Sequence, residues 1–226
     1  MTPRQSFSSH PRIRDAAALG FTSSLGPFAA NGIMPGFHAM AEDFGVSFVA
    51  VQQSLTIYLF TYAFFSLVAG SFSDSYGRRP TFIGGMLLFA AASIGAAFSQ
   101  SLWALDGWRL LQGIGAAVGQ VVTQAIVRDN WSGPEAANVN GMIAFFFAAG
   151  PALAPVVGGQ IVMLFGWHAV FLFLLVYSLS IAAFIYYRIP ETLHATDRSP
   201  FNLSAVCGNY AKGLTHGAFM TGVIAH

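Results

Sequence analysis

The sequence predicts an all-α membrane protein, a six-transmembrane-helix bundle, on three observations. Of its 226 residues, 55% are hydrophobic and only 8% are charged, against about 25% charged residues in an average soluble domain. The apolar residues gather in runs of about twenty, the length that a helix needs to cross a bilayer. These runs do not alternate apolar with polar residues, as the strands of a transmembrane β-barrel do. Too few charges remain to solvate a globular surface, so a soluble fold is excluded.

Polar breaks divide the chain into six predicted spans with flanking segments. The spans cover residues 16–37, 48–69, 81–99, 103–126, 139–162 and 168–187. A cytoplasmic tail, 1–15, is expected before them, and a cytoplasmic linker, 188–208, after them. Residues 209–226 become apolar again, but this stretch is too short to cross a bilayer. We interpret it as the truncated start of a seventh helix.

The basic residues fix the predicted orientation. Nine of the ten lie in the tail or in alternate loops: Arg4, Arg12, Arg14, Arg78, Arg79, Arg128, Arg188, Arg198 and Lys212. The opposite loops contain Glu42 and Asp43 and no basic residue. Because loops rich in Lys and Arg stay in the cytoplasm, both termini are predicted to be cytoplasmic.

Enzyme and cofactor chemistry has no support in the sequence. GxSxG, HExxH, Walker and CxxC patterns are all absent, and the six histidines do not have metal-ligand spacing. The single Cys207 excludes a disulfide framework within the chain. No nucleophile–base arrangement is visible, so a membrane enzyme is the weakest hypothesis. No metal, cofactor or nucleic acid is expected to bind.

Arg109, the tenth basic residue, lies within a predicted span. An Arg near a helix centre costs about 2.5–3.5 kcal/mol on insertion scales, and such a residue is by default functional. At 100° per residue it shares a helix face with Gln112, Gln120 and Thr123. Two candidate partners follow from position: Asn31, at a similar depth in the first span, and Asp106, one turn away on the same helix.

Two other spans also have a polar face. The residues are Ser54, Tyr58, Thr61 and Tyr62 in the second span, and Ser24, Pro27 and Asn31 in the first. Three polar faces favour a shared water-accessible cavity. The alternative, in which Ser and Thr only bind helices together, stays open.

The fifth span combines small residues and prolines. Gly150, Ala154 and Gly158 are four residues apart, a face that allows close approach of another backbone. Pro151 and Pro155 each remove a helical hydrogen bond and favour a kink. This helix is either simply close-packed or a bendable, sealing element beside a pathway.

Taken together, these motifs resemble those of the major facilitator superfamily. More narrowly they resemble the drug:proton antiporters of the bicyclomycin-resistance and chloramphenicol-efflux (Bcr/CflA) type, over roughly residues 16–195. The matching runs are Gly70-x-x-x-Asp74-x-x-Gly77-Arg78-Arg79-Pro80, Arg109-x-x-Gln112-Gly113-x-Gly115 with the later Arg128-Asp129, Gly150-Pro151-x-Leu-Ala-Pro155-x-x-Gly158-Gly159, Gly166-Trp167-His168 and Pro190-Glu191-Thr192. The resemblance implies one half of a major facilitator fold in a bacterial inner (plasma) membrane.

The resemblance also implies a function and its residues. The expected function is export of small drug-like molecules by proton antiport and alternating access, with the drug, the proton and the lipid bilayer as partners. The substrate and proton site would comprise Arg109, Asn31, Gln112, Gln120 and Tyr58. The cytoplasmic gate loop would comprise Gly70, Asp74, Gly77, Arg78 and Arg79, with Asp74 and Arg78 as a charge lock between the two halves. The motif Gly150, Pro151, Pro155, Gly158 and Gly159 would seal against a helix of the other half.

Two departures from the family pattern bear on this expectation. The family usually has an Asp ahead of the first-span proline, where this chain has Asn31-Gly-Ile-Met-Pro35. Asn cannot titrate, which argues against proton coupling through this position. The chain also holds only one six-span half, so a second half, from another chain or a homodimer, would have to complete the site. A metabolite importer of the same fold and a non-transporting partner of a full transporter are the alternatives.

Overall fold

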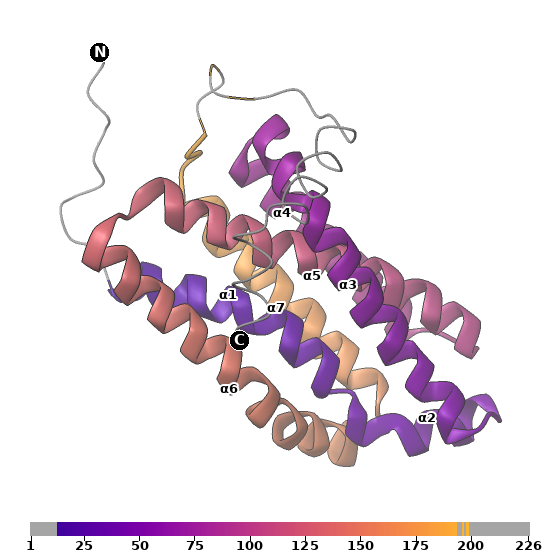
Figure 1. Ribbon diagram of the computed structural model, residues 1–226. Coiled ribbons are helices and arrows are strands. Elements are labelled where there is room, and N and C mark those ends of the chain that lie inside the picture. The colour runs from indigo at the N-terminus through magenta and orange to yellow at the C-terminus, as the bar shows by residue number, and fades with distance from the viewer. Residues whose placement is uncertain (1–12, 194–195, 197, 199–226) are drawn as a thin grey trace, which may run out of the picture.

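The computed structural model describes residues 13–193, 196 and 198. Its elements are α1 (Ile13–Asn31), the 3₁₀ helix η1 (Met34–Gly36), α2 (Phe37–Phe44), α3 (Phe48–Tyr76), α4 (Arg78–Ala97), α5 (Leu102–Asn130), α6 (Gly133–Phe165) and α7 (His168–Arg188). The described part of the chain contains no strand, and its long helices lie side by side (Figure 1). The predicted all-α membrane fold is thus confirmed. Most of the predicted tail and linker, and the whole predicted start of a seventh helix, lie outside the described residues.

Within the described part of the chain, five helices, α3 to α7, are long and apolar enough to cross a membrane. The sixth predicted span corresponds to α1, which has 19 residues. This helix carries Thr22, Ser23 and Ser24, and all three are buried. Its lower hydropathy therefore suits a helix in the interior of the bundle rather than one surrounded by lipid.

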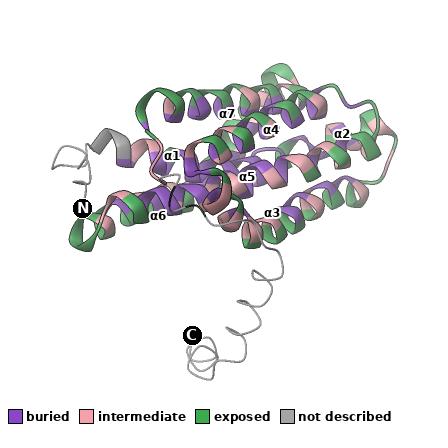
Figure 2. Ribbon diagram, turned by 90° about the horizontal axis from the view of Figure 1, so that it is seen from above, coloured by how far each residue is buried: buried purple, intermediate pink, exposed green. Residues whose placement is uncertain are grey.

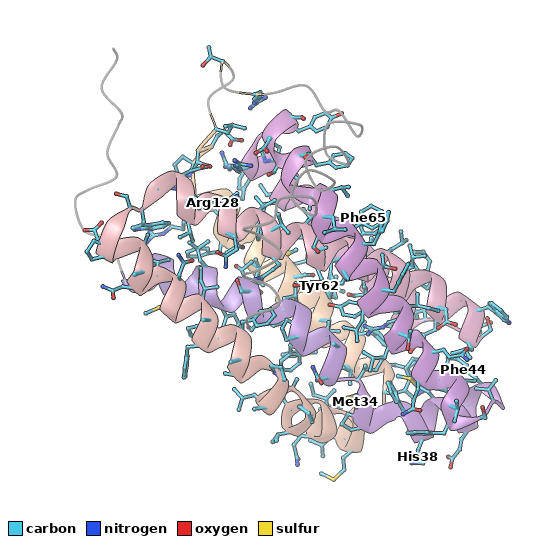
Figure 3. All side chains as sticks on the ribbon, viewed as in Figure 1. Met34, His38, Phe44, Tyr62, Phe65 and Arg128 are labelled. Carbon is cyan, nitrogen blue, oxygen red and sulfur yellow. The ribbon has the colours of Figure 1, made fainter. Side chains whose placement is uncertain are left out.

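The first predicted span, 16–37, is too long at its C-terminal end. Helix α1 stops at Asn31, and the chain turns through η1 into the short helix α2. Pro35 explains the stop, because its ring would clash with the carbonyl of Asn31 in a continued helix and it has no N–H to donate. Figure 3 shows Met34 at this turn, at the far end of the bundle from Arg128.

The polar break at 70–80 is not an extended loop. Helix α3 continues through Asp74 to Tyr76, and α4 begins at Arg78, so only Gly77 separates them. Gly77 has φ +102°, a conformation that glycine adopts at little cost. The predicted gate loop is therefore a one-residue break between two helix ends.

Helix α5 lies at the centre of the packing and contacts α3, α4 and α1, while α1 packs on α6 and α4 on α7. Glycines allow this proximity: a Cβ on Gly113 would lie 2.7 Å from the carbonyl oxygen of Tyr58 in α3, and one on Gly115 would lie 2.6 Å from that of Gly85 in α4. Such small residues let helix backbones touch. Figure 2 shows the result: α1 and α5 are mostly buried, and α3, α6 and α7 present exposed faces outward.

The two ends of the bundle differ in charge. Arg78 and Arg79, at the α3–α4 junction, lie at the same end as Arg128 (Figure 3), since Arg78 contacts Asp129 near the end of α5. We call this the basic end. At the other end, Trp167 donates from Nε1 to Oδ2 of Asp43 at 2.6 Å. Figure 3 labels His38 and Phe44 at that second end. Tyr62 is labelled midway between the two ends of the bundle.

Candidate functional site

Arg109 is fully buried in α5 and is held by three neutral groups. Its Nη1 donates to the carbonyl oxygen of Ala29 at 3.2 Å and to Oε1 of Gln112 at 2.9 Å. The guanidinium carbon lies 4.2 Å from the centroid of the Tyr58 ring, a cation–π contact that strengthens when water is excluded. The guanidinium is therefore fixed in place without a counter-charge in contact.

The groups around Arg109 are themselves tied to other helices. Gln112 donates from Nε2 to Oγ of Ser93 in α4 at 2.8 Å, and Tyr58 donates its hydroxyl to the carbonyl oxygen of Gly26 in α1 at 2.9 Å. Four helices thus converge on one cation. Its position is set by α1, α3, α4 and α5 together.

Part of the hydrogen-bonding capacity of this site is unused. Nε and Nη2 of Arg109 are buried and have no partner, and Oδ1 of Asp106 is likewise buried and unpaired. Among the described residues, no ion pair joins Asp106 to Arg109. Unmet buried donors on a charged group are costly, so this arrangement has capacity to bind an acceptor oxygen or water.

Two predicted members of the site, Asn31 and Gln120, make no hydrogen bond to this cluster within the described structure. Asn31 donates from Nδ2 to the carbonyl oxygen of Pro27 at 2.8 Å, within its own helix, and α1 contributes the Ala29 carbonyl instead. Gln120 is eight residues beyond Gln112, about 12 Å along the helix, and its buried Oε1 has no partner. The structure therefore brings together Arg109, Gln112 and Tyr58, and the roles of Asn31 and Gln120 stay predictions.

The basic end holds a second arginine cluster around Arg78. This buried side chain donates from Nε to Oδ2 of Asp129 at 3.0 Å and from Nη1 to Oγ of Ser73 at 2.6 Å, and it also pairs with Asp74. Thr192 donates to the same Asp129 oxygen at 3.0 Å. The predicted Asp74–Arg78 pair thus forms within one bundle, and its role as a lock between two halves stays a prediction.

Glu191 is a member of this cluster that the sequence did not single out as a site residue. Its Oε1 accepts from the backbone N–H of Arg78 at 2.9 Å and from that of Leu193 at 3.0 Å. The carboxylate therefore caps the N-terminus of α4, where Gly77 offers no side chain. The Pro190-Glu191-Thr192 run is the sequence feature from which this contact could have been predicted. Both of its polar residues contact the cluster.

The gate residues Arg79 and Gly70, and Arg128 of the separate Arg128-Asp129 run, lie near this cluster. Arg79 donates to the carbonyl oxygen of Tyr186, and its guanidinium carbon lies 4.8 Å from the centroid of that ring. Arg128 is exposed, whereas its neighbour Asp129 holds Arg78. Gly70 lies within α3 and supplies the carbonyl that accepts from Ser73.

The glycines of α6 pack against α1 of the same bundle. A Cβ on Gly158 would overlap the carbonyl oxygen of Gly32, and one on Gly150 would lie 3.3 Å from Cβ of Pro27. Pro151 is exposed, whereas Pro155 and Gly159 are half-buried, and the helix runs without a break past both prolines. The two buried glycines pack closely on α1 within this bundle, and sealing of the whole motif against another half stays a prediction.

These observations define a multi-pass helical membrane protein with a fixed, uncompensated cation inside its bundle. The chain belongs to the Major Facilitator Superfamily, whose family model it matches over residues 19–223. The resemblance to this family predicted from the motifs is thereby confirmed.

Named relatives agree with the narrower resemblance. The chain is 33% identical over 192 residues to a bicyclomycin resistance protein homolog of Haemophilus influenzae, covering 85% of this chain and 48% of the relative. It is 36% identical over 160 residues to a chloramphenicol resistance protein of Pseudomonas aeruginosa, covering 70% of this chain and 38% of the relative. The chain thus spans half or less of the length of these two relatives.

A solved structure supports the fold. The chain superposes on the crystal structure of a peptide transporter, POT, with a TM-score of 0.70 and 20% sequence identity, covering 98% of this chain and 47% of that one. At this identity the likeness shows the fold alone.

Proposed function

We propose that this chain forms one half of a transporter that exports small drug-like molecules by proton antiport and alternating access. The relatives' names support the substrate class, since two of them refer to resistance against bicyclomycin and chloramphenicol. In this superfamily the substrate site lies between two six-helix halves. The proposed substrate site is therefore one that this chain would form together with a second six-helix unit.

The observation that carries the proposal is the unused half of the Arg109 guanidinium. Nη1 is committed to Ala29 and Gln112, while Nε and Nη2 have no partner. Carbonyl, nitro and hydroxyl oxygens of a drug would accept from these donors. Both donors are buried in this structure, so a drug oxygen would reach them when the helices around Arg109 move apart during alternating access.

Proton coupling needs a group that titrates, and Arg109 keeps its proton. Asn31 cannot titrate either. Asp106 lies one turn away from Arg109 on α5, with Oδ1 buried and unpaired. We propose Asp106 as the acid whose charge responds to the proton and, through Arg109, to the bound drug.

Alternating access would use the cluster at the basic end. Arg78 links the end of α3, the start of α4 and the end of α5, and Glu191 links the segment after α7 to the same point. Breaking and remaking these contacts would let the ends of four helices move relative to one another.

Drug accumulation in cells tests the proposal. Bacteria lacking their own efflux pumps would express the chain, alone and together with a separate second six-helix half, and take up chloramphenicol with and without a protonophore. We expect cells with the transporter to accumulate less chloramphenicol than cells with empty vector. This reduction should disappear on addition of protonophore and in Arg109→Ala, and it should persist in the control Arg128→Ala. Accumulation equal to empty vector in both arrangements would contradict export, and higher accumulation would indicate import.

A further inference from the structure

An open cavity lies between α1, α6 and α7, and it shares no residue with the Arg109 site. Its volume is about 440 Å³, within the range of about 300–1,000 Å³ typical of ligand pockets. The walls include Ala18 and Phe21 of α1, Phe146 of α6, and Ile181 and Phe184 of α7. The proposed export function gives this cavity no role.

The aromatic walls of this cavity are fixed by packing. The ring of Phe146 lies directly over Gly20 of α1, where a Cβ would come within 2.5 Å of it. Phe21 meets Phe146 edge to face at 6.1 Å between ring centroids and lies 4.9 Å from the ring of Tyr177. The cavity is therefore formed before any ligand binds.

The three hydroxyl groups of the lining already use their donors within the protein. Thr22 donates to the carbonyl oxygen of Ala18 at 2.9 Å, Ser180 to that of Val176 at 2.7 Å, and Tyr177 to that of Phe21 at 2.8 Å. Among the described residues, none that lines the cavity is charged. A ligand oxygen would find no free side-chain donor here and would lose hydration, and six of the nine lining residues are Ala, Phe or Ile, so the lining favours hydrocarbon.

The cavity also lies at the depth of lipid acyl chains. Its α7 residues, from Tyr177 to Phe184, precede Arg188 at the end of that helix by 4 to 11 residues, about 6–17 Å at 1.5 Å per residue. Half of a hydrocarbon core is about 15 Å thick. The opening therefore faces one leaflet, the one nearer the basic end.

We propose that this cavity binds one acyl chain of a membrane phospholipid from the leaflet nearer the basic end. The chain would fill the space between α6 and α7 over the floor formed by α1. The inference depends on insertion in a membrane and does not depend on drug export.

Photo-crosslinking tests the proposal. The full chain would be reconstituted into liposomes containing a phosphatidylcholine with a diazirine in one acyl chain, irradiated and digested, and the labelled peptides quantified. We expect peptides containing Phe21, Phe146 and Phe184 to be labelled several-fold more than those from the exposed face of α3. Uniform labelling would mean ordinary boundary lipid and would overturn the proposal.

Two variants and a control make the test specific. Ala18→Leu fills the cavity, and Ser180→Trp blocks it from an exposed position, so that the second variant serves even if the first does not fold. Each should reduce cavity labelling at least about 5-fold, while Ala183→Leu, on the exposed face of α7, should leave it unchanged. Unchanged labelling in Ser180→Trp would overturn the proposal.

A competition arm separates lipid from drug. Excess chloramphenicol should leave cavity labelling unchanged if the occupant is an acyl chain. Displacement of the label by chloramphenicol would assign the cavity to the drug and overturn the lipid assignment. Drug accumulation in the Ser180→Trp variant, measured in the same cells as above, should equal that of the unsubstituted chain.

Discussion

Arg109 and Arg78 are both buried arginines, but only Arg78 is in contact with acidic side chains. Arg78, 7% exposed, contacts two carboxylates and a serine hydroxyl. Arg109, 0% exposed, contacts a backbone carbonyl, an amide and an aromatic ring. One cation has its counter-charge built into the fold, and the other does not.

The difference separates two uses of the same side chain. A cation paired with acids at helix ends ties those ends together, and its contacts can be exchanged when the ends move. A cation held by neutral groups keeps an uncompensated charge and, for Arg109, two unpaired donors. Substitutions can remove this difference in charge pairing between the two arginines, or measure its effect on transport and stability.

Removing Arg109 should have the largest effect. In Arg109→Ala we expect transport to fall at least about 100-fold, equivalent to about 2.7 kcal/mol of lost stabilisation. Uptake and efflux of labelled drug in cells or proteoliposomes would measure it. The fold should survive, because the lost side chain leaves no acid without its partner.

The matched control is the same substitution at Arg78. Arg78→Ala leaves Asp74 and Asp129 without their cation, so its melting temperature should fall more than that of Arg109→Ala. A larger fall in melting temperature in Arg109→Ala than in Arg78→Ala would show that Arg109 is chiefly structural. The proposed difference in role between the two arginines would then be wrong.

Supplying Arg109 with an acid should make it resemble Arg78. Gln112→Glu places a carboxylate where the amide oxygen now lies, 2.9 Å from Nη1. We expect transport to fall about 10-fold, or about 1.4 kcal/mol, while the melting temperature is maintained or raised. Gln112→Leu is the control, since it removes the amide without adding charge and should lower the melting temperature. Wild-type transport in Gln112→Glu would mean that the uncompensated charge is not required.

The two acids of Arg78 should contribute unequally. The side chain of Asp129 is 25% exposed and that of Asp74 is 46% exposed, so water screens the second pair more. Asp129 also accepts from Thr192. We expect Asp129→Asn to lower the free energy of unfolding by about 1–2 kcal/mol and Asp74→Asn by under about 1 kcal/mol.

Denaturation in detergent at two salt concentrations would measure both variants. The Asp74→Asn effect should shrink at high salt, since exposed pairs are screened. Equal losses in the two variants would show that the difference in exposure is irrelevant. For function, we expect Asp74→Asn to keep drug binding and to slow turnover, and unchanged turnover would remove its role in gating.

The sequence predicts the centre of the bundle better than its ends. Arg109 and Gln112 are three residues apart on one helix, and this spacing alone places their side chains together. The Tyr58 contact follows from a polar face on a second span, although no pattern gives its distance. The Ala29 carbonyl could not be predicted, because a backbone group leaves no signal in the residue types.

Helix ends escaped prediction for two physical reasons. Equal depth in two continuous spans predicts Asn31 near Arg109. Pro35 ends the first helix at Asn31, whose amide donates to the Pro27 carbonyl of its own helix, and the role of Asn31 stays a prediction. The polar residues and two glycines of the 70–80 segment predict a loop. Its polar residues remain helical because Arg78 folds back over Asp74 across the Gly77 break and contacts its carboxylate.

The smallest expected effect concerns Glu191, which ties the segment after α7 to the Arg78 cluster. In Glu191→Gln the side-chain oxygen can still accept from the backbone N–H groups of Arg78 and Leu193, so only the negative charge at the N-terminus of α4 is lost. A charge there contributes about 0.3–1 kcal/mol, and the melting temperature should fall accordingly. Glu191→Ala removes the acceptor as well and should cost more. If the two variants were equally stable, the charge of Glu191 and not its hydrogen bonds would hold the segment after α7. The cluster at the basic end would then be purely electrostatic, unlike the hydrogen-bonded surroundings of Arg109.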